Sequence, residues 1–139
     1  MDERRFYPQL TAKILNQPPE SIFISVITVE EILQGALASV QKTKRKSSVV
    51  AAYQYFEELF SALNKFQILS YTAEAELIYQ SLSAKIKRIG TQDCRIAAIA
   101  KANKFTIVTV NINDFVDIGL VDVEAVSYTH LTLPTILLV

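Results

Sequence analysis

The segment Ile89–Ala100 has the sequence IGTQDCRIAAIA, and the segment Thr106–Phe115 has the sequence TIVTVNINDF. These two segments decide the fold. Thr91 precedes a run rich in alanine and isoleucine, and this order predicts a helix over 92–103 that is capped by the threonine. Such a helix carries Asp93 in its first turn.

An apolar, β-branched run over 105–110 predicts a parallel strand that is covered on both faces. Asn111 and Asp114 follow it in a polar turn. Upstream, the segment Ile24–Gly35 has the same order of strand, polar cap and helix, and it carries Glu31. Because ligands bind beyond the carboxyl ends of strands in parallel sheets, these polar side chains are expected at one edge.

The rest of the chain alternates helical and extended patterns, which predicts an α/β fold with a mostly parallel sheet and helices on both faces. Expected helices cover 5–16, 29–40 with Thr28 as the N-cap, 48–65, and 73–88 with Thr72 as the N-cap. Expected strands cover 21–27, 66–70 and 120–123. The basic segment 41–47 is expected to be a solvated connection.

The chain has 139 residues, and this length predicts a single domain. Lys plus Arg and Asp plus Glu number 14 each, so nucleic-acid binding requires a local basic patch. The single Cys94 cannot form an internal disulfide and fits a reduced, cytoplasmic protein. Three glycines and one histidine exclude a Gly-rich phosphate loop and a His-based zinc site or catalytic pair.

The last fifteen residues, 125–139, contain no Asp, Glu, Lys or Arg. This run is shorter than the roughly 20 residues of a membrane-spanning helix, and no membrane association is expected. Residues 126–135 (VSYTHLTLPT) resemble a translated sequencing adapter. Residues 126–139 are therefore predicted to be a non-native or disordered tail, and 1–125 the domain. His130, the only histidine, lies in this tail and is not a candidate ligand or base.

Glu31, Asp93 and Asp114 are candidate metal ligands. Carboxylates gathered at one edge repel each other, and a divalent cation removes that repulsion. Mg²⁺ or Mn²⁺ held by carboxylates can activate water for attack on a phosphodiester. Taken singly, each acid also has a structural explanation: a capping box for Glu31, the helix dipole for Asp93, and turn formation for Asn111 and Asp114.

Three motifs carry a resemblance to a known family: ITVxEIxxG, then IGTQDxRIAAIA, then VTxNxxDF. Together they resemble the PIN-domain ribonucleases, and most closely the VapC-type toxins of bacterial toxin–antitoxin pairs, over about residues 8–124. The resemblance implies a PIN-like three-layer α/β/α fold. It also implies an endoribonuclease that depends on Mg²⁺ or Mn²⁺, forms a homodimer and is neutralised by a VapB-type antitoxin.

By position, Glu31 matches the second acid of the family and Asp93 the third. The last acid falls at Asn111 in some members and at Asp114 in others. Here Asp114 carries the charge, and Asn111 is a polar helper. Thr109 matches a hydroxyl position near the scissile phosphate.

The chain departs from the family pattern at its start. The family opens with an apolar strand that ends in Asp-Thr-Asp or Asp-Thr-Asn and supplies the first metal ligand. No such strand is present, and Asp2 cannot replace it because Met1 precedes it and Glu3 follows. The sheet is therefore expected to lack its first strand, and metal binding and RNA cleavage are expected to be weak. A non-catalytic interaction module and an inactive gene fragment are the alternatives.

Arg88 and Arg95 are the candidate RNA contacts. The basic cluster at 42–46 is more typical of a solvated loop than of an RNA grip. The aromatic residues between 53 and 60 are expected to fill the core, with some of them available for a dimer or antitoxin interface.

Overall fold

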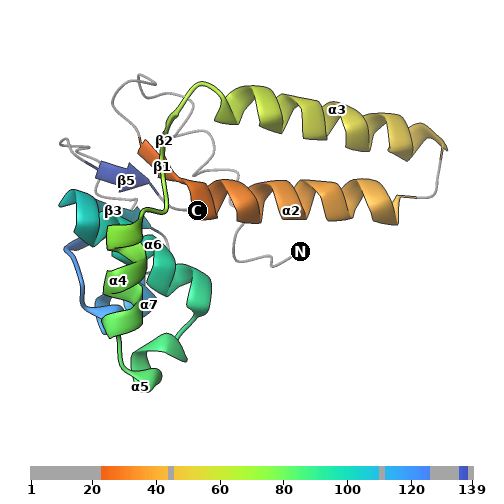
Figure 1. Cartoon of the computed structure of the whole chain (residues 1–139). Coiled ribbons are helices and arrows are strands. Elements are labelled where there is room, and N and C mark those ends of the chain that lie inside the picture. The colour runs from red at the N-terminus through yellow and green to blue at the C-terminus, as the bar shows by residue number, and fades with distance from the viewer. Residues whose placement is uncertain (1–22, 44–45, 110–111, 126–134, 138–139) are drawn as a thin grey trace.

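The computed structural model describes residues 23–43, 46–109, 112–125 and 135–137. Five short strands and six helices make up this part of the chain (Figure 1). The strands are β1 (Phe23–Ser25), β2 (Gln67–Leu69), β3 (Thr106–Thr109), β4 (Val123–Ala125) and β5 (Thr135–Leu137). The helices are α2 (Val26–Lys42), α3 (Lys46–Leu63), α4 (Ala73–Ser81), α5 (Ala84–Lys87), α6 (Thr91–Asn103) and α7 (Ile112–Ile118). The helix expected over 5–16 lies outside the described residues.

The strands form one sheet in the order β2-β1-β5-β3-β4, and all its neighbouring pairs are parallel. This confirms the expected α/β fold with a parallel sheet. Strand β5 occupies the centre, where Ile136 pairs with both Phe23 of β1 and Ile107 of β3. Residues 135–137 fall within the segment 126–139 that was predicted to be a tail. They form strand β5, which pairs with β1 and with β3.

Helix α6 is the centre of the core. Its residues Ile96–Ala100 are at most 1% exposed, and α4, α5 and α7 pack around it. The small alanines let these neighbours approach closely, while Phe115 of α7 and Ile107 of β3 complete the apolar cluster. Burying one such large side chain contributes roughly 1.5–3 kcal/mol. This packing holds the start of α6 at a defined place on the sheet.

Helices α2 and α3 lie side by side and extend away from the sheet (Figure 1). The prediction that the aromatic residues of α3 fill the core is wrong for Tyr53, Tyr55 and Phe60, which are exposed. Their exposure follows from the placement of α3, which packs on α2 rather than on the sheet. Leu63, at the end of the helix, is buried.

The boundaries predicted for the helices over 29–40 and 73–88 are wrong. Helix α2 begins at Val26, because Ser25 is the N-cap and its side chain accepts from the backbone N–H of Thr28. The helix expected over 73–88 is interrupted at Leu82, which is extended, and Ser83 caps a separate helix by accepting from a backbone N–H. Serine competes for backbone hydrogen bonds and so favours such breaks.

The remaining strands lie close to their predicted positions, and β4 begins where the expected strand at 120–123 ends. None of the helices in the described ranges combines the length and apolar character needed to cross a bilayer.

Candidate active site

The buried polar side chains of the described part gather at one edge of the sheet. They are Ser25, Thr28, Asp93 and Thr109, each at most 4% exposed. Ser25 and Thr109 end strands β1 and β3, and Thr28 and Asp93 lie in the first turns of α2 and α6. Carboxyl ends of parallel strands and the starts of their helices share one edge, which is where ligands bind in such folds. These four buried polar side chains therefore lie at the carboxyl edge of the sheet.

Asp93 is the third residue of α6 and the acid of its first turn. Thr91 was expected to cap this helix, but the N-cap is Gly90, which makes no side-chain cap bond. The Asp93 carboxylate lies beside Gly90, and a Cβ on that glycine would stand 3.7 Å from Oδ2 of Asp93. A negative charge at this place is stabilised by the helix dipole. The Asp93 side chain is thus buried at the start of α6.

Glu31 is the sixth residue of α2 and is partly buried. Because Ser25 is the N-cap, Thr28 occupies the third helical position that a capping-box acid would need. The capping-box explanation of Glu31 is therefore wrong. The neighbouring Glu30 is exposed, and its Oε1 accepts a hydrogen bond of 2.8 Å from Nε2 of Gln92 on α6. This contact joins the α2 segment that carries Glu31 to the start of α6.

Asp114 lies in the first turn of α7, a helix that packs on α6, and it is partly buried. It is a helix-start residue rather than the turn former that its local sequence suggested. Thr109 ends β3 just before this region. Asn111 lies outside the described residues. Glu31, Asp93, Thr109 and Asp114 each take part in interactions within the structure.

The oxygen donors at this edge match Mg²⁺ in kind but not in number. No three Asp, Glu, His or Cys side chains within the described ranges stand close enough together to hold a metal ion. Mg²⁺ is often bound through one or two carboxylates and keeps several of its waters. The donor set therefore fits a weakly held ion rather than a closed cage.

Ser25 is a site residue that the sequence reasoning missed. Its Oγ lies 2.9 Å from Oγ1 of Thr28 and accepts from the Thr28 N–H at 3.0 Å. The available signal was a small hydroxyl residue at the last position of an apolar strand. The two hydroxyls fix the junction of β1 and α2, on which Glu31 is mounted.

The two arginines differ in their surroundings. Arg88 is exposed at the end of α5. The Arg95 guanidinium lies over the ring of Tyr79, with Cζ 5.2 Å from the ring centroid, and its Nη1 donates to Oε1 of Gln92 at 3.3 Å. Lys87 Nζ lies 5.0 Å from the centroid of the same ring. Arg95 thus ties α6 to α4, and contact with RNA stays a prediction for both arginines.

Tyr71 and Glu76 form a hydrogen-bonded pair near Arg95. Tyr71 donates its hydroxyl to Oε1 of Glu76 at 2.7 Å, and Gln80 donates to Oε2 at 3.3 Å. Burial and then the bond to Glu76 raise the pKa of Tyr71 to about 12. The bonds from Tyr71 and then Gln80 lower the pKa of Glu76.

The thiol of Cys94, the single cysteine, lies in the hydrophobic core. Cys94 is fully buried, and its Sγ donates to the backbone carbonyl of Ile86 at 3.4 Å. Burial raises the pKa of the Cys94 thiol. A buried thiol with a raised pKa is a poor nucleophile, so the chemistry of this edge is that of carboxylates and hydroxyls.

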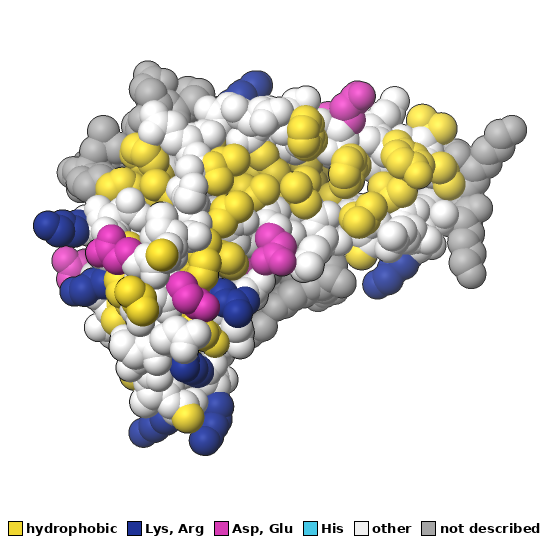
Figure 2. All heavy atoms as spheres, viewed as in Figure 1, with side chains coloured by type: hydrophobic (Ala, Val, Ile, Leu, Met, Phe, Trp, Pro, Cys, Tyr) yellow, Lys and Arg dark blue, Asp and Glu magenta, His cyan; other side chains and the backbone are white. Residues whose placement is uncertain are grey.

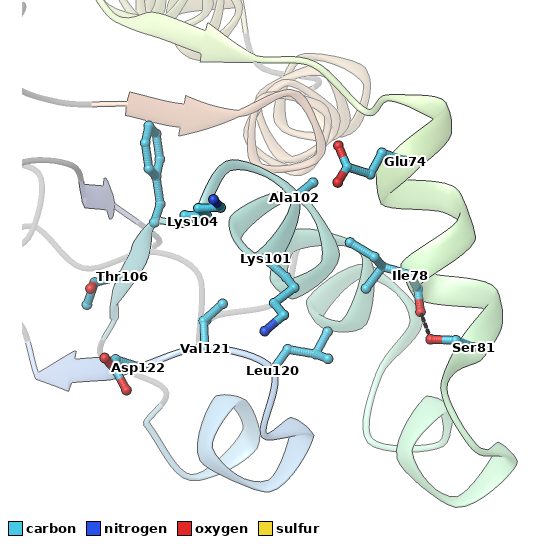
Figure 3. Close-up of a pocket in the computed structure, with 11 residues that line it drawn as sticks. Glu74, Ile78, Ser81, Lys101, Ala102, Lys104, Thr106, Leu120, Val121 and Asp122 are labelled. Carbon is cyan, nitrogen blue, oxygen red and sulfur yellow. Dashed lines mark hydrogen bonds between the residues drawn. The ribbon is translucent and has the colours of Figure 1, made fainter.

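A hollow of about 680 Å³ lies at the other end of α6 (Figure 3). Lys101 and Lys104 of α6, Thr106 at the start of β3, and Asp122 before β4 line it. From Asp93 to Lys101 the helix rises about 12 Å along its axis. The hollow therefore belongs to the amino edge of the sheet and is separate from the carboxylates.

Comparison with known proteins gives a family match over most of the chain. The model of the PIN domain matches residues 3–119. The chain is also 32% identical over 108 residues to the plasmid stability protein StbB of Pseudomonas syringae pv. tomato, which covers 75% of each protein.

Two solved structures have a similar fold. A DNA-bound VapBC from Salmonella typhimurium matches with a TM-score of 0.63 at 22% identity, over 85% of each chain. VapBC2 from Rickettsia felis, bound to a fragment of its promoter DNA, matches with a TM-score of 0.52 at 27% identity. That match covers 87% of this chain and 84% of the other.

Proposed function

The chain belongs to the PIN-domain family as a VapC-type protein, and from this premise we propose that it is a metal-dependent endoribonuclease of a toxin–antitoxin pair. VapC-type PIN domains are generally metal-dependent nucleases. The observation that carries the proposal is the gathering of buried polar side chains at the carboxyl edge of the sheet. Asp93 is the acid among these buried polar side chains.

The residues at this edge have separate roles in the proposal. Asp93 and Asp114, each in the first turn of a helix, and Glu31 on α2 are the carboxylates of the proposal. Because no three potential ligands cluster within the described residues, one or two of these acids hold the ion. The Thr109 hydroxyl, at the end of β3, donates to a substrate oxygen. A bound Mg²⁺ or Mn²⁺ supplies a water of lowered pKa and offsets phosphodiester charge. The protein residues orient the RNA backbone at this group of oxygens.

The experiment that tests the proposal compares the chain with its Asp93→Asn variant. Asparagine keeps the size of the side chain but removes the charge that attracts a cation. A Mn²⁺ concentration of 100 times Kd stabilises a folded protein by about 2.7 kcal/mol, so melting with Mn²⁺ and with EDTA reports binding even where RNA cleavage is slow. We expect Mn²⁺ to stabilise the wild type and to have little effect on the variant.

Asp122→Asn is the matched control, because Asp122 is exposed and lies at the opposite edge. It is expected to respond to Mn²⁺ as the wild type does. Cleavage of a fluorescent RNA is measured on the same three proteins. An identical Mn²⁺ response, or identical RNA cleavage, in the wild type and Asp93→Asn contradicts the proposed site.

The α2–α3 pair is the proposed surface for a VapB-type antitoxin. Figure 2 shows hydrophobic side chains gathered along this pair on one face of the molecule. Tyr53 and Phe60 of α3 are 59% and 52% exposed, and Leu37 of α2 is exposed as well. Contiguous exposed apolar surface marks sites of protein association. Both similar structures are VapBC complexes, which supports an antitoxin as the occupant.

Lysine substitutions test this surface. Tyr53→Lys and Phe60→Lys place charge on the apolar face and are expected to prevent co-purification with a VapB-type antitoxin. Leu77→Lys is the control, because Leu77 is 71% exposed on α4, away from this pair. Equal loss of antitoxin in all three variants contradicts the assignment. We also propose a cytoplasmic homodimer, and light scattering of the free protein tests the dimer.

A non-catalytic interaction module is the second candidate function. It is favoured by the finding that no three potential ligands cluster within the described part of the chain. This function predicts antitoxin binding that is independent of Mn²⁺, together with no RNA cleavage by wild type or Asp93→Asn. The melting and cleavage measurements above separate it from the nuclease.

A further inference from the structure

A chain of side-chain contacts joins three helices at the candidate site. Gln92 donates from Nε2 to Oε1 of Glu30 at 2.8 Å, although the two residues are 62 positions apart. Its other amide atom, Oε1, accepts from Nη1 of Arg95 at 3.3 Å. Arg95 in turn lies over the ring of Tyr79. The contacts therefore link α2 to α6 and α6 to α4.

We infer that Glu30, Gln92 and Arg95 form a latch that positions Glu31 and Asp93 relative to each other. This inference rests on the proposed function, in which both acids serve one site. Glu30 precedes Glu31 on α2, and Gln92 precedes Asp93 on α6. Neighbouring residues of a helix differ by about 1.5 Å in rise and 100° in rotation. The bond between Glu30 and Gln92 therefore fixes the spacing between Glu31 and Asp93.

The latch residues Glu30 and Gln92 are more exposed than the acids that follow them. Glu30 is exposed and Gln92 is partly buried, whereas Glu31 is partly buried and Asp93 is 4% exposed. The latch thus lies at the outer rim of the edge, with the acids inside it. Exposed polar contacts add little to overall stability. The effect of the latch is on the positions of the two acids, because metal ligands must be held within about 0.5 Å of their working positions.

The hydrogen bond from Arg95 sets the orientation of the Gln92 side-chain amide. An amide can donate to a carboxylate and accept from a guanidinium, and Gln92 does both at once. Charge on both partners strengthens such hydrogen bonds. Asparagine is too short to reach both partners. A glutamate at position 92 would face the Glu30 carboxylate with like charge.

This charge logic gives a break-and-repair experiment. Gln92→Glu opposes two carboxylates and opens the latch. Adding Glu30→Gln restores an amide–carboxylate bond with its direction reversed, and the new carboxylate at position 92 still accepts from Arg95. The control is Gln54→Glu, which adds the same charge beside Glu57 and Glu58 on the exposed face of α3.

Amide hydrogen exchange without metal is the first measurement. Gln92→Glu is expected to speed exchange about fivefold in the first turn of α6 and around Glu31, as for loss of one net hydrogen bond. The double variant is expected to return to wild-type rates, and Gln54→Glu to leave them unchanged. Unchanged exchange in Gln92→Glu, or failure of the double variant to restore it, overturns the latch.

Mn²⁺-induced broadening of backbone NMR signals is the second measurement. In the wild type, Mn²⁺ is expected to broaden the amide signals of both Glu31 and Asp93. In Gln92→Glu the two are expected to respond unequally, and the double variant is expected to restore them together. Absence of broadening in the wild type overturns the proposed metal site and leaves the exchange result to decide the latch. Equal broadening of both signals in Gln92→Glu overturns the latch alone.

Discussion

The Ser25 Oγ accepts a hydrogen bond of 3.0 Å from the backbone N–H of Thr28, and this bond sets the start of α2. Local sequence offers both residues as caps, since each has a hydroxyl before an apolar helical run. In the structure the cap is Ser25, and Thr28 is buried in the first turn. Glu31 consequently lies past the capping positions. Helix capping therefore does not explain Glu31, and the proposed site gives this acid a role.

Replacing the cap should destabilise the fold measurably. We expect Ser25→Ala to lower the free energy of unfolding by about 1–2 kcal/mol, at the upper part of the usual range for N-caps, because the lost hydroxyl also partners buried Thr28. Urea denaturation measures the change. Ser83→Ala removes the cap of the exposed, four-residue α5 and is expected to cost less. Equal costs for the two variants contradict the assigned role of Ser25.

The order of helices and strands could be predicted because it depends on local pattern. The apolar, β-branched run of β3 and the alanine- and isoleucine-rich run of α6 are strong local signals, and both elements form close to the expected positions. The break at Ser83 could not be predicted with the same certainty. The Ser83 hydroxyl can bond within a continuing helix or cap a new one. Which of the two forms also depends on the packing of α5 on α6.

The candidate site was predictable only in part. Asp93 and Asp114 each lie in the first turn of a helix, and the turn signals around them are visible in the sequence. The bond between Glu30 and Gln92 is not visible there, because it joins residues 62 positions apart. Neither is the stacking of Arg95 on Tyr79, which depends on how α4 packs against α6.

The Tyr71–Glu76 pair predicts a specific pH dependence. A carboxyl whose folded pKa is lowered contributes stability above pH 4.5, and this contribution is lost as the pH falls through the folded pKa. Tyr71→Phe removes the largest cause of that lowering. We therefore expect the pKa of Glu76 to rise toward 4.5 in the variant, measured by carbon NMR titration of its carboxyl group.

Gln80→Ala is the companion variant, since Gln80 is the second cause of the lowered Glu76 pKa. Its effect is expected to have the same sign and to be smaller. On the alkaline side, Tyr71 has a raised pKa of about 12, so its contribution is present below pH 10 and is lost as the pH rises through 12. A larger shift in Gln80→Ala than in Tyr71→Phe contradicts this order of causes.

Lys104 offers a route to higher stability. It ends α6 in the left-handed conformation, with φ 61° and ψ 42°, where glycine is the favoured residue. We expect Lys104→Gly to raise the free energy of unfolding by roughly 0.5–1 kcal/mol, because it removes the strain of a Cβ. Lys101→Gly, within the last turn of the same helix, removes the same charge and is expected to lower stability by about 1 kcal/mol. A lowered urea midpoint in both variants contradicts the argument that a Cβ at position 104 strains the backbone.

Strand β5 lies where no local pattern placed it, and its backbone pairing can be tested at Ile136. This residue is aligned with Phe23 on one side and Ile107 on the other, so its N–H faces a partner strand whichever way it points. Ile136→Pro removes that N–H, and an unmet buried backbone partner costs about 1–3 kcal/mol. We expect a matching loss of stability in urea denaturation. If Ile136→Pro unfolds at the wild-type midpoint, residues 135–137 contribute nothing to the sheet, and the segment is the tail that its composition indicates.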